Sequence, residues 1–408
     1  AVPAAAAPQA RVDVDAAPAP PSAGRRLRPA LRRGLACFAL GVPALAGLFS
    51  VLCLSLPDSA SLVADAGTGS GFPQGETLLA LALADWGGIP VWPYVTPAQL
   101  AVRTAMADVA RRAPAPPRAV LALGDNFYMA GVRDVDDPRF NSTFEAVYTQ
   151  DHPELGRPAQ WKVVAGNHDY GQNVSAQMAY TNRSRAWHFP SAYYSFRETV
   201  TPGVVVDFVM CDTVVLAAGS PWGLSGAEAR AQGEAHWAWL ERELAGSRAD
   251  YLVVGGHYPA LSVGHHGPTP GLSERLRGLL AAHNASAYLS GHDHCAQAFL
   301  DGAVEHHGVG GAHLLDPFAP NKGSVPEGSL RMHYGGSIWP ANVYKGAFAA
   351  ISVAEDGGHM TITHIDSDGR TLFSSRVPPR RGSPRGRRRE QSESAAERPR
   401  RHADVDQS

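Results

Sequence analysis

The chain has 408 residues, 44% of them hydrophobic, and a formal net charge of −2. This length allows one large domain with appendages or two domains, and the composition is that of a globular protein. Four cysteines are too few for a disulfide scaffold. Arginines gather near both ends, so no continuous basic stripe runs through the middle and nucleic acid is not an expected partner.

The N-terminal region carries a targeting or anchoring signal. Residues 1–24 are rich in Ala and Pro and are predicted to be disordered. Residues 25–57 combine clustered arginines with an apolar run at 35–56, which is long enough to span a bilayer. The arginines favour a cytosolic N-terminal side, and a signal anchor and a cleaved signal peptide fit this pattern equally. Residues 58–75 are predicted to be a linker.

Residues 76–376 alternate strand-like runs with helical patterns. The stretch 96–113 starts with a Thr cap candidate, has apolar residues at helical spacing and ends in arginines, and 233–246 and 272–283 repeat this pattern. Alternating strands and helices indicate a largely parallel sheet covered on both faces. The last part, 344–377, is instead typical of antiparallel strands with Asp-Gly turns.

Four N-glycosylation sequons fall inside residues 76–376, the predicted folded domain, at Asn141, Asn173, Asn182 and Asn284. Together with the N-terminal segment they predict a protein of the secretory pathway that is secreted, lumenal or membrane-anchored, with its catalytic domain outside the cytosol. Residues 377–408 form an arginine-rich, low-complexity segment that is predicted to be a disordered, solvated tail.

Five short motifs carry seven candidate metal ligands, and each motif follows an apolar run that is typical of a buried strand. ADWGG contains Asp85, GDNFY contains Asp125 and Tyr128, GNHD contains Asn167, GHYP contains His257, and GHDH contains His292 and His294. Strand ends followed by glycine turns are where an α/β sandwich brings distant side chains together. We therefore expect a two-metal site, which is a standard means of hydrolysing phosphate esters.

The first two motifs indicate which metal the site prefers. Many two-metal phosphoesterases have Asp-x-His in the first motif, whereas Gly87 stands at the histidine position here. Tyr128, three residues after Asp125, can restore the missing ligand. A phenolate is a hard anionic donor that suits Fe(III), and the carboxylate of Asp125 can bridge both metals.

The remaining ligands suit a divalent ion. The amide oxygen of Asn167 and the imidazoles of His257 and His292 form a donor set fit for Zn(II), Fe(II) or Mn(II). His292 and His294 are two residues apart, so on an extended segment both point the same way and one can face each metal.

Four further residues are expected around the metals. His168 should project toward the substrate, and His266 lies on a loop that can reach the same pocket, although neighbouring His265 competes for this role. Asp169 and Asp293 are candidates to orient imidazoles from behind the ligands, with a local turn hydrogen bond as the alternative.

ADWGG, LGDNFY, AGNHDY, GHYP, HGPT and YLSGHDH resemble the motifs of the purple acid phosphatases, specifically the small tartrate-resistant type, over about residues 76–376. The resemblance implies an α/β fold, the four-layer αββα metallophosphoesterase sandwich, with a binuclear Fe(III)–M(II) centre at strand ends. It assigns the Fe(III) ligands as Asp85, Asp125, Tyr128 and His294, and the divalent-metal ligands as Asp125, Asn167, His257 and His292. It makes His168 and His266 the substrate-facing pair.

The activity implied is that of an acid phosphatase, in which hydroxide activated at the Fe(III)–M(II) centre attacks a phosphate monoester. The alternatives are a metallophosphoesterase acting on phosphoproteins or phosphodiesters, and a non-catalytic membrane-anchored binding module. The cysteines depart from that family's pattern, so Cys211 and Cys295 either pair with each other or remain buried thiols.

Overall fold

The computed structural model describes residues 75–156, 160–220, 223–337 and 344–389. The hydrophobic segment 35–56, its flanking N-terminal segments and the end of the arginine-rich tail all lie outside the described residues. Within the described ranges, no helix combines the length and the apolar composition needed to cross a bilayer.

The first sheet has seven strands in the order β14-β13-β12-β1-β2-β3-β4. Its parallel strands are β1 (Glu76–Leu83), β2 (Ala119–Leu123), β3 (Gln160–Val164) and β4 (Trp187–His188). Its antiparallel strands are β12 (Ala347–Ala354), β13 (Met360–Asp366) and β14 (Thr371–Val377). The predicted antiparallel C-terminal strands are thus confirmed, and β12 lies directly beside β1, the first of the described strands.

The second sheet also has seven strands, in the order β11-β9-β10-β8-β7-β6-β5. Its parallel strands are β6 (Val204–Met210), β7 (Tyr251–Gly255), β8 (Ala287–Ser290) and β10 (Val304–Val309). The antiparallel strands β5 (Tyr194–Thr201), β9 (Ala296–Asp301) and β11 (Leu330–Tyr334) complete it.

Six α-helices and four shorter or wider helical turns connect the described strands. The α-helices are α2 (Pro97–Arg112), α3 (Pro153–Gly156), α4 (Val174–Ala179), α5 (Thr213–Leu216), α6 (Ala227–Gly246) and α7 (Ser273–Ala282). The others are the π-helix η1 (Phe140–Thr149) and the 3₁₀ turns η2 (Asp169–Gly171), η3 (Tyr180–Asn182) and η4 (Lys322–Ser324). α2 begins at the predicted cap, since Thr96 and Gln99 exchange the two hydrogen bonds of a capping box.

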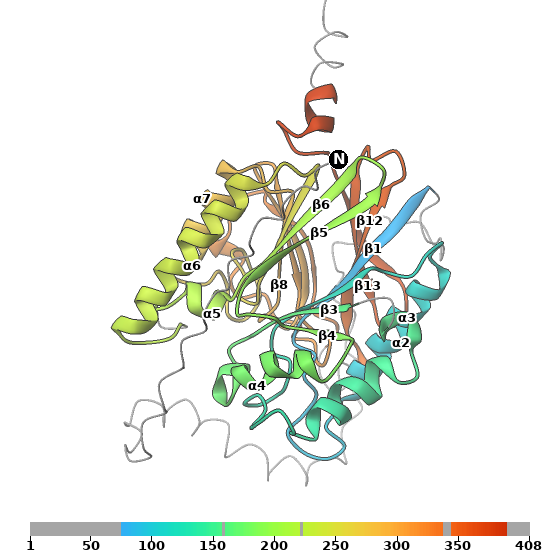
Figure 1. Ribbon diagram of the computed structural model, residues 1–408, viewed down its shortest axis with the longest axis vertical. Helices are drawn as coiled ribbons and strands as arrows, with labels where there is room; N and C mark the ends of the chain where they lie inside the picture. Colours follow the sequence, from blue (N-terminus) through green and yellow to red (C-terminus); the bar gives the residue numbers. More distant parts are fainter. Residues whose placement is uncertain (1–74, 157–159, 221–222, 338–343, 390–408) are drawn as a thin grey trace, which may run out of the picture. The chain divides into compact units, whose positions relative to one another are not determined.

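The layers explain the apolar runs of the central strands. Along β7, Tyr251 and Val253 face the core between the sheets, whereas Leu252 and Val254 pack with α6 and α7. Because side chains alternate along a strand, a strand buried on both faces must be apolar at every position. α6 and α7 lie outside the second sheet and α2 and α3 outside the first (Figure 1), so the predicted four-layer sandwich is confirmed.

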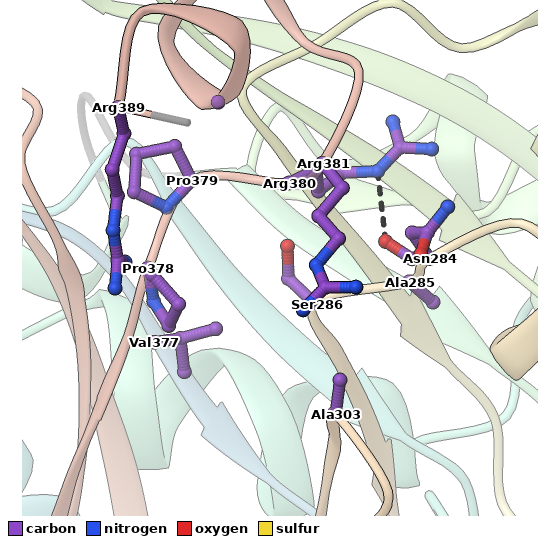
Figure 2. A pocket seen from close by; sticks show the side chains of 11 residues that line it. Asn284, Ala285, Ser286, Ala303, Val377, Pro378, Pro379, Arg380, Arg381 and Arg389 are labelled. Carbon is purple, nitrogen blue, oxygen red and sulfur yellow. Dashed lines mark hydrogen bonds between the residues drawn. The ribbon is translucent and has the colours of Figure 1, made fainter. Parts of the chain in front are cut away.

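Residues 378–389 belong to the predicted tail, yet they pack against the domain. The guanidinium of Arg380 donates to the main-chain oxygens of Asn284 (2.9 Å) and His283 (2.7 Å) and to the hydroxyl of Ser247 (2.9 Å). Figure 2 shows the bond to Asn284 beside a cavity of about 400 Å³ between this segment and the start of β8. An arginine that satisfies several carbonyls at once holds the segment in place.

Candidate metal centre

The candidate ligands lie at the carboxyl ends of strands from both sheets. Asp85, Asp125 and Asn167 follow β1, β2 and β3, whereas His257 follows β7, and His292 and His294 follow β8. The two sheets are joined at this edge, where the Ala84 amide donates to the Val309 carbonyl at 3.1 Å. The structure therefore brings together residues that are far apart in the sequence.

Three of these residues have a left-handed backbone. The φ angle is 55° at Asp85, 52° at Asp125 and 71° at His292, a region that residues with side chains seldom occupy. Glycines supply the space around them: a Cβ atom at Gly291 would lie 2.6 Å from Asp85 Oδ2, and one at Gly166 would overlap the Asp125 carboxylate. Strained conformations of this kind concentrate at functional sites, because the surrounding fold has to impose them.

Tyr128 is the centre of the first cluster. Its hydroxyl oxygen lies 3.0 Å from Asp85 Oδ1, 3.1 Å from Asp125 Oδ2 and 3.0 Å from His294 Nε2. These four side chains are the set that the resemblance assigns to Fe(III). Three anionic or hard oxygen donors and one imidazole converge on one small volume, which is the chemistry that a trivalent iron requires.

The second cluster lies on the other side of the Asp125 carboxylate. His257 Nε2 is 3.5 Å from Asp125 Oδ1 and 3.0 Å from Asn167 Oδ1, and the His257 and His292 rings are 5.2 Å apart. The Leu123 carbonyl lies 2.9 Å from His257 Nδ1 and leaves Nε2 to face the cluster. Because the two oxygens of Asp125 face different clusters, this carboxylate has the position of a bridge.

The electrostatics of the site fit bound cations. Asp85, Asp125 and His257 are buried, and one ligand atom of each lies within 4.8 Å of the others. Burial, followed by the charge of Asp125, raises the pKa of Asp85 well above its usual value, and burial raises the pKa of Tyr128 well above its usual value. Within the described ranges the ion pairs of the two carboxylates are with histidines alone. Metal ions would supply the missing positive charge and favour the deprotonated ligands.

Gly87 explains why the site uses a tyrosine. A Cβ atom at this position would lie 2.5 Å from the Phe127 amide nitrogen and 2.7 Å from the Asp125 carbonyl oxygen. The chain that carries Asp125 and Tyr128 thus occupies the space that any side chain at Gly87 would need. The glycine in place of the histidine of Asp-x-His therefore agrees with the backbone geometry. A histidine side chain does not fit at position 87, whereas Tyr128 points into the first cluster.

His168 is placed beside the ligands and is partly open to solvent. Its Nδ1 atom lies 2.6 Å from the Met129 carbonyl, and its Nε2 atom lies 3.9 Å from Asp125 Oδ2. The side chain is 29% exposed. With Nδ1 held by the main chain, Nε2 is the atom available to a bound substrate.

His266 packs against His292 of the second cluster. Its ring is nearly parallel to that of His292, with centroids 4.2 Å apart. Asp293 holds the loop, because its carboxylate accepts hydrogen bonds from the His266 and Gly267 amides at 2.7 and 3.2 Å and from the Ser262 hydroxyl. These bonds hold main chain and a hydroxyl rather than an imidazole, which differs from the expectation for Asp293.

The hydrogen bonds of Asp169 differ from expectation in the same way. Its carboxylate accepts from the main-chain amides of Asn126 and Gly166 and from the side chain of Gln177. Burial, followed by the charge of Asp125, raises its pKa to about 7. Asp169 therefore fixes the Asp125 loop against the Asn167 loop and does not orient an imidazole, because amide donors surround it.

One histidine near the metals was not anticipated from the sequence. The His313 ring packs 4.2 Å from the Tyr128 ring, and its Nδ1 atom lies 2.7 Å from the main-chain oxygen of Asp85. It follows the end of β10 after Gly310, Gly311 and Ala312, so, like the candidate ligands, it stands just beyond a strand end with glycine nearby. The signal was obscured because the run VEHHGV contains a glutamate and two histidines and does not look like a buried strand.

The predicted glycosylation sites are exposed, and the two cysteines of the described domain are free thiols. The asparagines of all four sequons, Asn141, Asn173, Asn182 and Asn284, are exposed at the surface. Cys211 and Cys295 are buried free thiols and form no disulfide.

Comparisons with known proteins place these features in a family. Residues 80–296 match the calcineurin-like phosphoesterase family. Tartrate-resistant acid phosphatase type 5 of Oryctolagus cuniculus is 39% identical over 310 residues, which cover 74% of this chain and 92% of that protein. Purple acid phosphatase 7 of Arabidopsis thaliana is 32% identical over 195 residues, or 44% of this chain and 54% of that protein.

A solved structure has the same fold at lower sequence identity. It is described as "GAP50 the anchor in the inner membrane complex of Plasmodium" and has a TM-score of 0.62 at 19% identity, covering 79% of this chain and 95% of that chain. At this identity the likeness concerns the architecture of the sandwich alone.

Proposed function

Because the chain belongs to the calcineurin-like phosphoesterases and, within them, to the purple acid phosphatases, we propose that it hydrolyses phosphate monoesters at a centre of one Fe(III) and one divalent ion. The observation that carries the proposal is the position of Tyr128, whose hydroxyl lies about equally close to Asp85, Asp125 and His294. Burying a phenol hydroxyl between two carboxylates is unfavourable unless a cation binds there and offsets their charge.

We assign the ligands by the two clusters. Asp85, Asp125, Tyr128 and His294 would hold Fe(III), and Asp125, Asn167, His257 and His292 would hold Zn(II), Fe(II) or Mn(II). When bound, the two ions would offset the negative charge of the phosphate and polarise it toward attack. Asp125 would belong to both sets, which makes it the residue on which the centre depends most.

His168 and His266 would act on the substrate rather than on the metals. His168 lies beside Asp125 and His266 beside His292, and both are at least partly exposed to solvent. Because Nδ1 donates to the Met129 carbonyl, His168 Nε2 would carry a proton only in the imidazolium form, and in that form it would donate a hydrogen bond to the phosphate or a proton to the leaving oxygen. His266→Ala should therefore keep both metals and slow turnover, whereas unaltered turnover would remove His266 from the mechanism.

The visible absorption spectrum of the purified, oxidised protein tests the proposal. Phenolate bound to Fe(III) should give a broad band and a purple colour, and Tyr128→Phe should lose the band while retaining the fold. A colourless protein with two bound metals and phosphatase activity would disprove the Fe(III) assignment. Turnover of monoesters compared with diesters, measured on the same sample, distinguishes the acid phosphatase from the phosphodiesterase alternative.

We also propose that the catalytic domain functions outside the cytosol, either anchored through residues 35–56 or released into a lumen. The proposal rests on the arginine-flanked apolar run and on the exposure of all four sequon asparagines. Enzymatic removal of N-linked glycans should increase the electrophoretic mobility of the protein purified from a eukaryotic host. Replacement of all four asparagines by glutamine should abolish this change, and no change in the parent protein would argue against translocation.

A further inference from the structure

Six large apolar side chains are exposed in the described ranges, and five of them lie on loops linked to the candidate metal centre. In the described part of the chain, large hydrophobic residues with substantial exposure are Val91 (60%), Trp92 (83%), Met129 (48%), Leu314 (36%), Phe318 (61%) and Tyr344 (64%). Single exposed apolar residues are ordinary on a protein surface. A set that gathers around one site is not, and such groupings mark places where a ligand or partner binds.

The loop that carries Val91 and Trp92 starts at the candidate metal centre. It follows Asp85 within the same connection between β1 and α2. The loop returns to the site at its far end, where the Thr96 hydroxyl donates to the His313 carbonyl at 2.9 Å. One end of this loop therefore follows a residue of the first cluster, and the other is bonded to His313, whose ring packs on Tyr128 of that cluster.

Met129 and Leu314 each follow a residue of the first cluster or its support. Met129 comes directly after Tyr128, and its carbonyl lies 2.6 Å from His168 Nδ1. Leu314 comes directly after His313, whose Nδ1 lies 2.7 Å from the Asp85 carbonyl. Met129 and Leu314 are therefore each adjacent in the sequence to a residue of the candidate metal centre, where the phosphate is proposed to bind.

Phe318 is connected to the same site through two hydrogen bonds. Its amide donates to Asp316 Oδ1 at 2.9 Å, and the Asp316 amide donates to the His294 carbonyl at 2.6 Å. We call Val91, Trp92, Met129, Leu314 and Phe318 the apolar rim. Every member lies on a loop that carries a predicted metal ligand or bonds to one.

The charges of these loops are as informative as their apolar side chains. Residues 86–95 and 126–132 contain no charged residue, and 311–320 contain one carboxylate, Asp316, and no Lys or Arg. The nearest basic residues along these loops are Arg133, which is paired with Asp137, and Lys322, which lies beyond Phe318 in the sequence. The five apolar side chains themselves offer a leaving group exposed hydrocarbon to cover and no charge.

We propose that the apolar rim binds the leaving group of the substrate, so that the preferred phosphomonoesters carry an uncharged aromatic or alkyl group next to the phosphate. The inference rests on the proposed function, because it takes the phosphate to bind at the metal centre. It adds a selectivity that the metal ligands themselves do not provide, since they contact the part common to all monoesters.

The test compares two substrates that are both phosphates of primary alcohols, hexyl phosphate and glucose 6-phosphate, on the full chain with its metals. Because the leaving groups are chemically alike at the ester oxygen, a difference in kcat/KM reports contacts made farther away. We expect hexyl phosphate to be preferred by at least about tenfold, the effect of burying roughly two methylene groups.

The variants Trp92→Ser and Phe318→Ser locate the preference. Each should lower kcat/KM for hexyl phosphate by about three- to tenfold and leave kcat/KM for glucose 6-phosphate, metal content and Tm unchanged, since both side chains are exposed. Arg381→Ser, an exposed change in the C-terminal segment, is the matched control and should alter neither substrate.

The outcomes separate this inference from the proposed function. Equal kcat/KM for the two substrates, or a preference that survives the combined Trp92→Ser and Phe318→Ser change, would overturn the inference and leave the phosphatase intact. A metal-loaded protein that hydrolyses neither substrate would overturn the proposed function and this inference with it. Loss of both activities in the rim variants, with metals retained, would also contradict the inference, because the rim would then act on the phosphate itself.

Discussion

The two ends of the central strands differ in how their charged side chains are neutralised. β8 starts just after Asn284, whose carbonyl accepts from Arg380, and ends just before His292. At the first end a cation is surrounded by main-chain carbonyls that satisfy it. At the second end buried carboxylates and a phenol face one another, and histidines are the basic groups with which they pair in the described ranges.

The same contrast appears at β7. Before the strand, Asp250 accepts a hydrogen bond from the Val205 amide and lies near the Arg385 guanidinium. A main-chain donor and a cation thus stabilise its negative charge. After the strand, His257 Nε2 lies 3.5 Å from Asp125 Oδ1 and 3.0 Å from Asn167 Oδ1, so potential ligand atoms converge there. We therefore expect mutations at the metal end of these strands to reduce metal binding and activity. Mutations at the opposite end should instead reduce the stability of the fold.

The largest contrast is expected for carboxylates. Asp125→Ala removes the one carboxylate that faces both clusters, so it should abolish binding of both metals and lower kcat/KM by at least about 10³-fold. Metal analysis and steady-state kinetics check this. Asp250→Ala is the matched change at the other end and should cost stability but retain metals and activity per folded molecule; loss of metals there would break the comparison.

Two glycines provide the next contrast. At Gly87 a methyl group would overlap the main chain of Asp125 and Phe127 at 2.5–2.7 Å, so Gly87→Ala should destabilise the fold by about 3 kcal/mol or more and weaken metal binding. At Gly278 in α7 no heavy atom lies within 4 Å of the position that a methyl group would take, so Gly278→Ala should stabilise by about 0.5–1 kcal/mol. Urea unfolding of both variants measures the difference, and a neutral Gly87→Ala would contradict the proposed packing.

Arg380 tests whether the opposite end contributes only stability. Arg380→Ala leaves the carbonyls of His283 and Asn284 without their donor, and we expect a loss of about 2–3 kcal/mol in the free energy of unfolding. Arg380→Lys should recover only part of this, since an ammonium cannot reproduce the planar fork. Activity per folded molecule should stay constant in both, and a change in KM would mean that the two ends are coupled.

The smallest expected effect concerns pH and lies at the first end of the strands, where Glu305 pairs with Ala287. Burial raises the pKa of Glu305 in β10 to about 7, so between about pH 4.5 and 7 the folded state binds more protons than the unfolded state, and stability falls as pH rises. Glu305→Gln removes this loss. The variant should be more stable than the parent by about 1–2 kcal/mol at pH 8 and equal to it at pH 4. A variant that is less stable at pH 8 would reverse the sign and disprove the assignment.

Much of the metal end could be predicted from the sequence because its signals are local. Each apolar run followed by glycine and a polar residue corresponds to a strand end, and Thr96 marks the start of α2 as expected. What could not be predicted depends on partners distant in the chain. The roles of Asp169 and Asp293 follow from which amides lie near them, and His313 was hidden because β10 carries polar residues.

The apolar rim and the packed C-terminal segment were missed for a related reason. Trp92 and Phe318 stand in loops without periodicity, so the sequence does not distinguish a buried from an exposed aromatic there. Arg380 lies in a stretch whose composition is typical of disorder, yet carbonyls exposed by the end of α7 give it fixed partners. Composition describes the average behaviour of a segment and not the local donors and acceptors that it meets.

The pairing of β1 with β12 has a consequence for how the protein matures during synthesis. All seven predicted ligands precede residue 296, but the strand that covers the free edge of β1 begins only at Ala347. A nascent chain that has just exposed His294 therefore has every predicted ligand but still lacks β12, one of the two strands that flank β1 and so position Asp85. Metal loading should wait until residues 347–354 have been synthesised, and a fragment that stops at residue 296 should bind metal more weakly although it contains the whole ligand set.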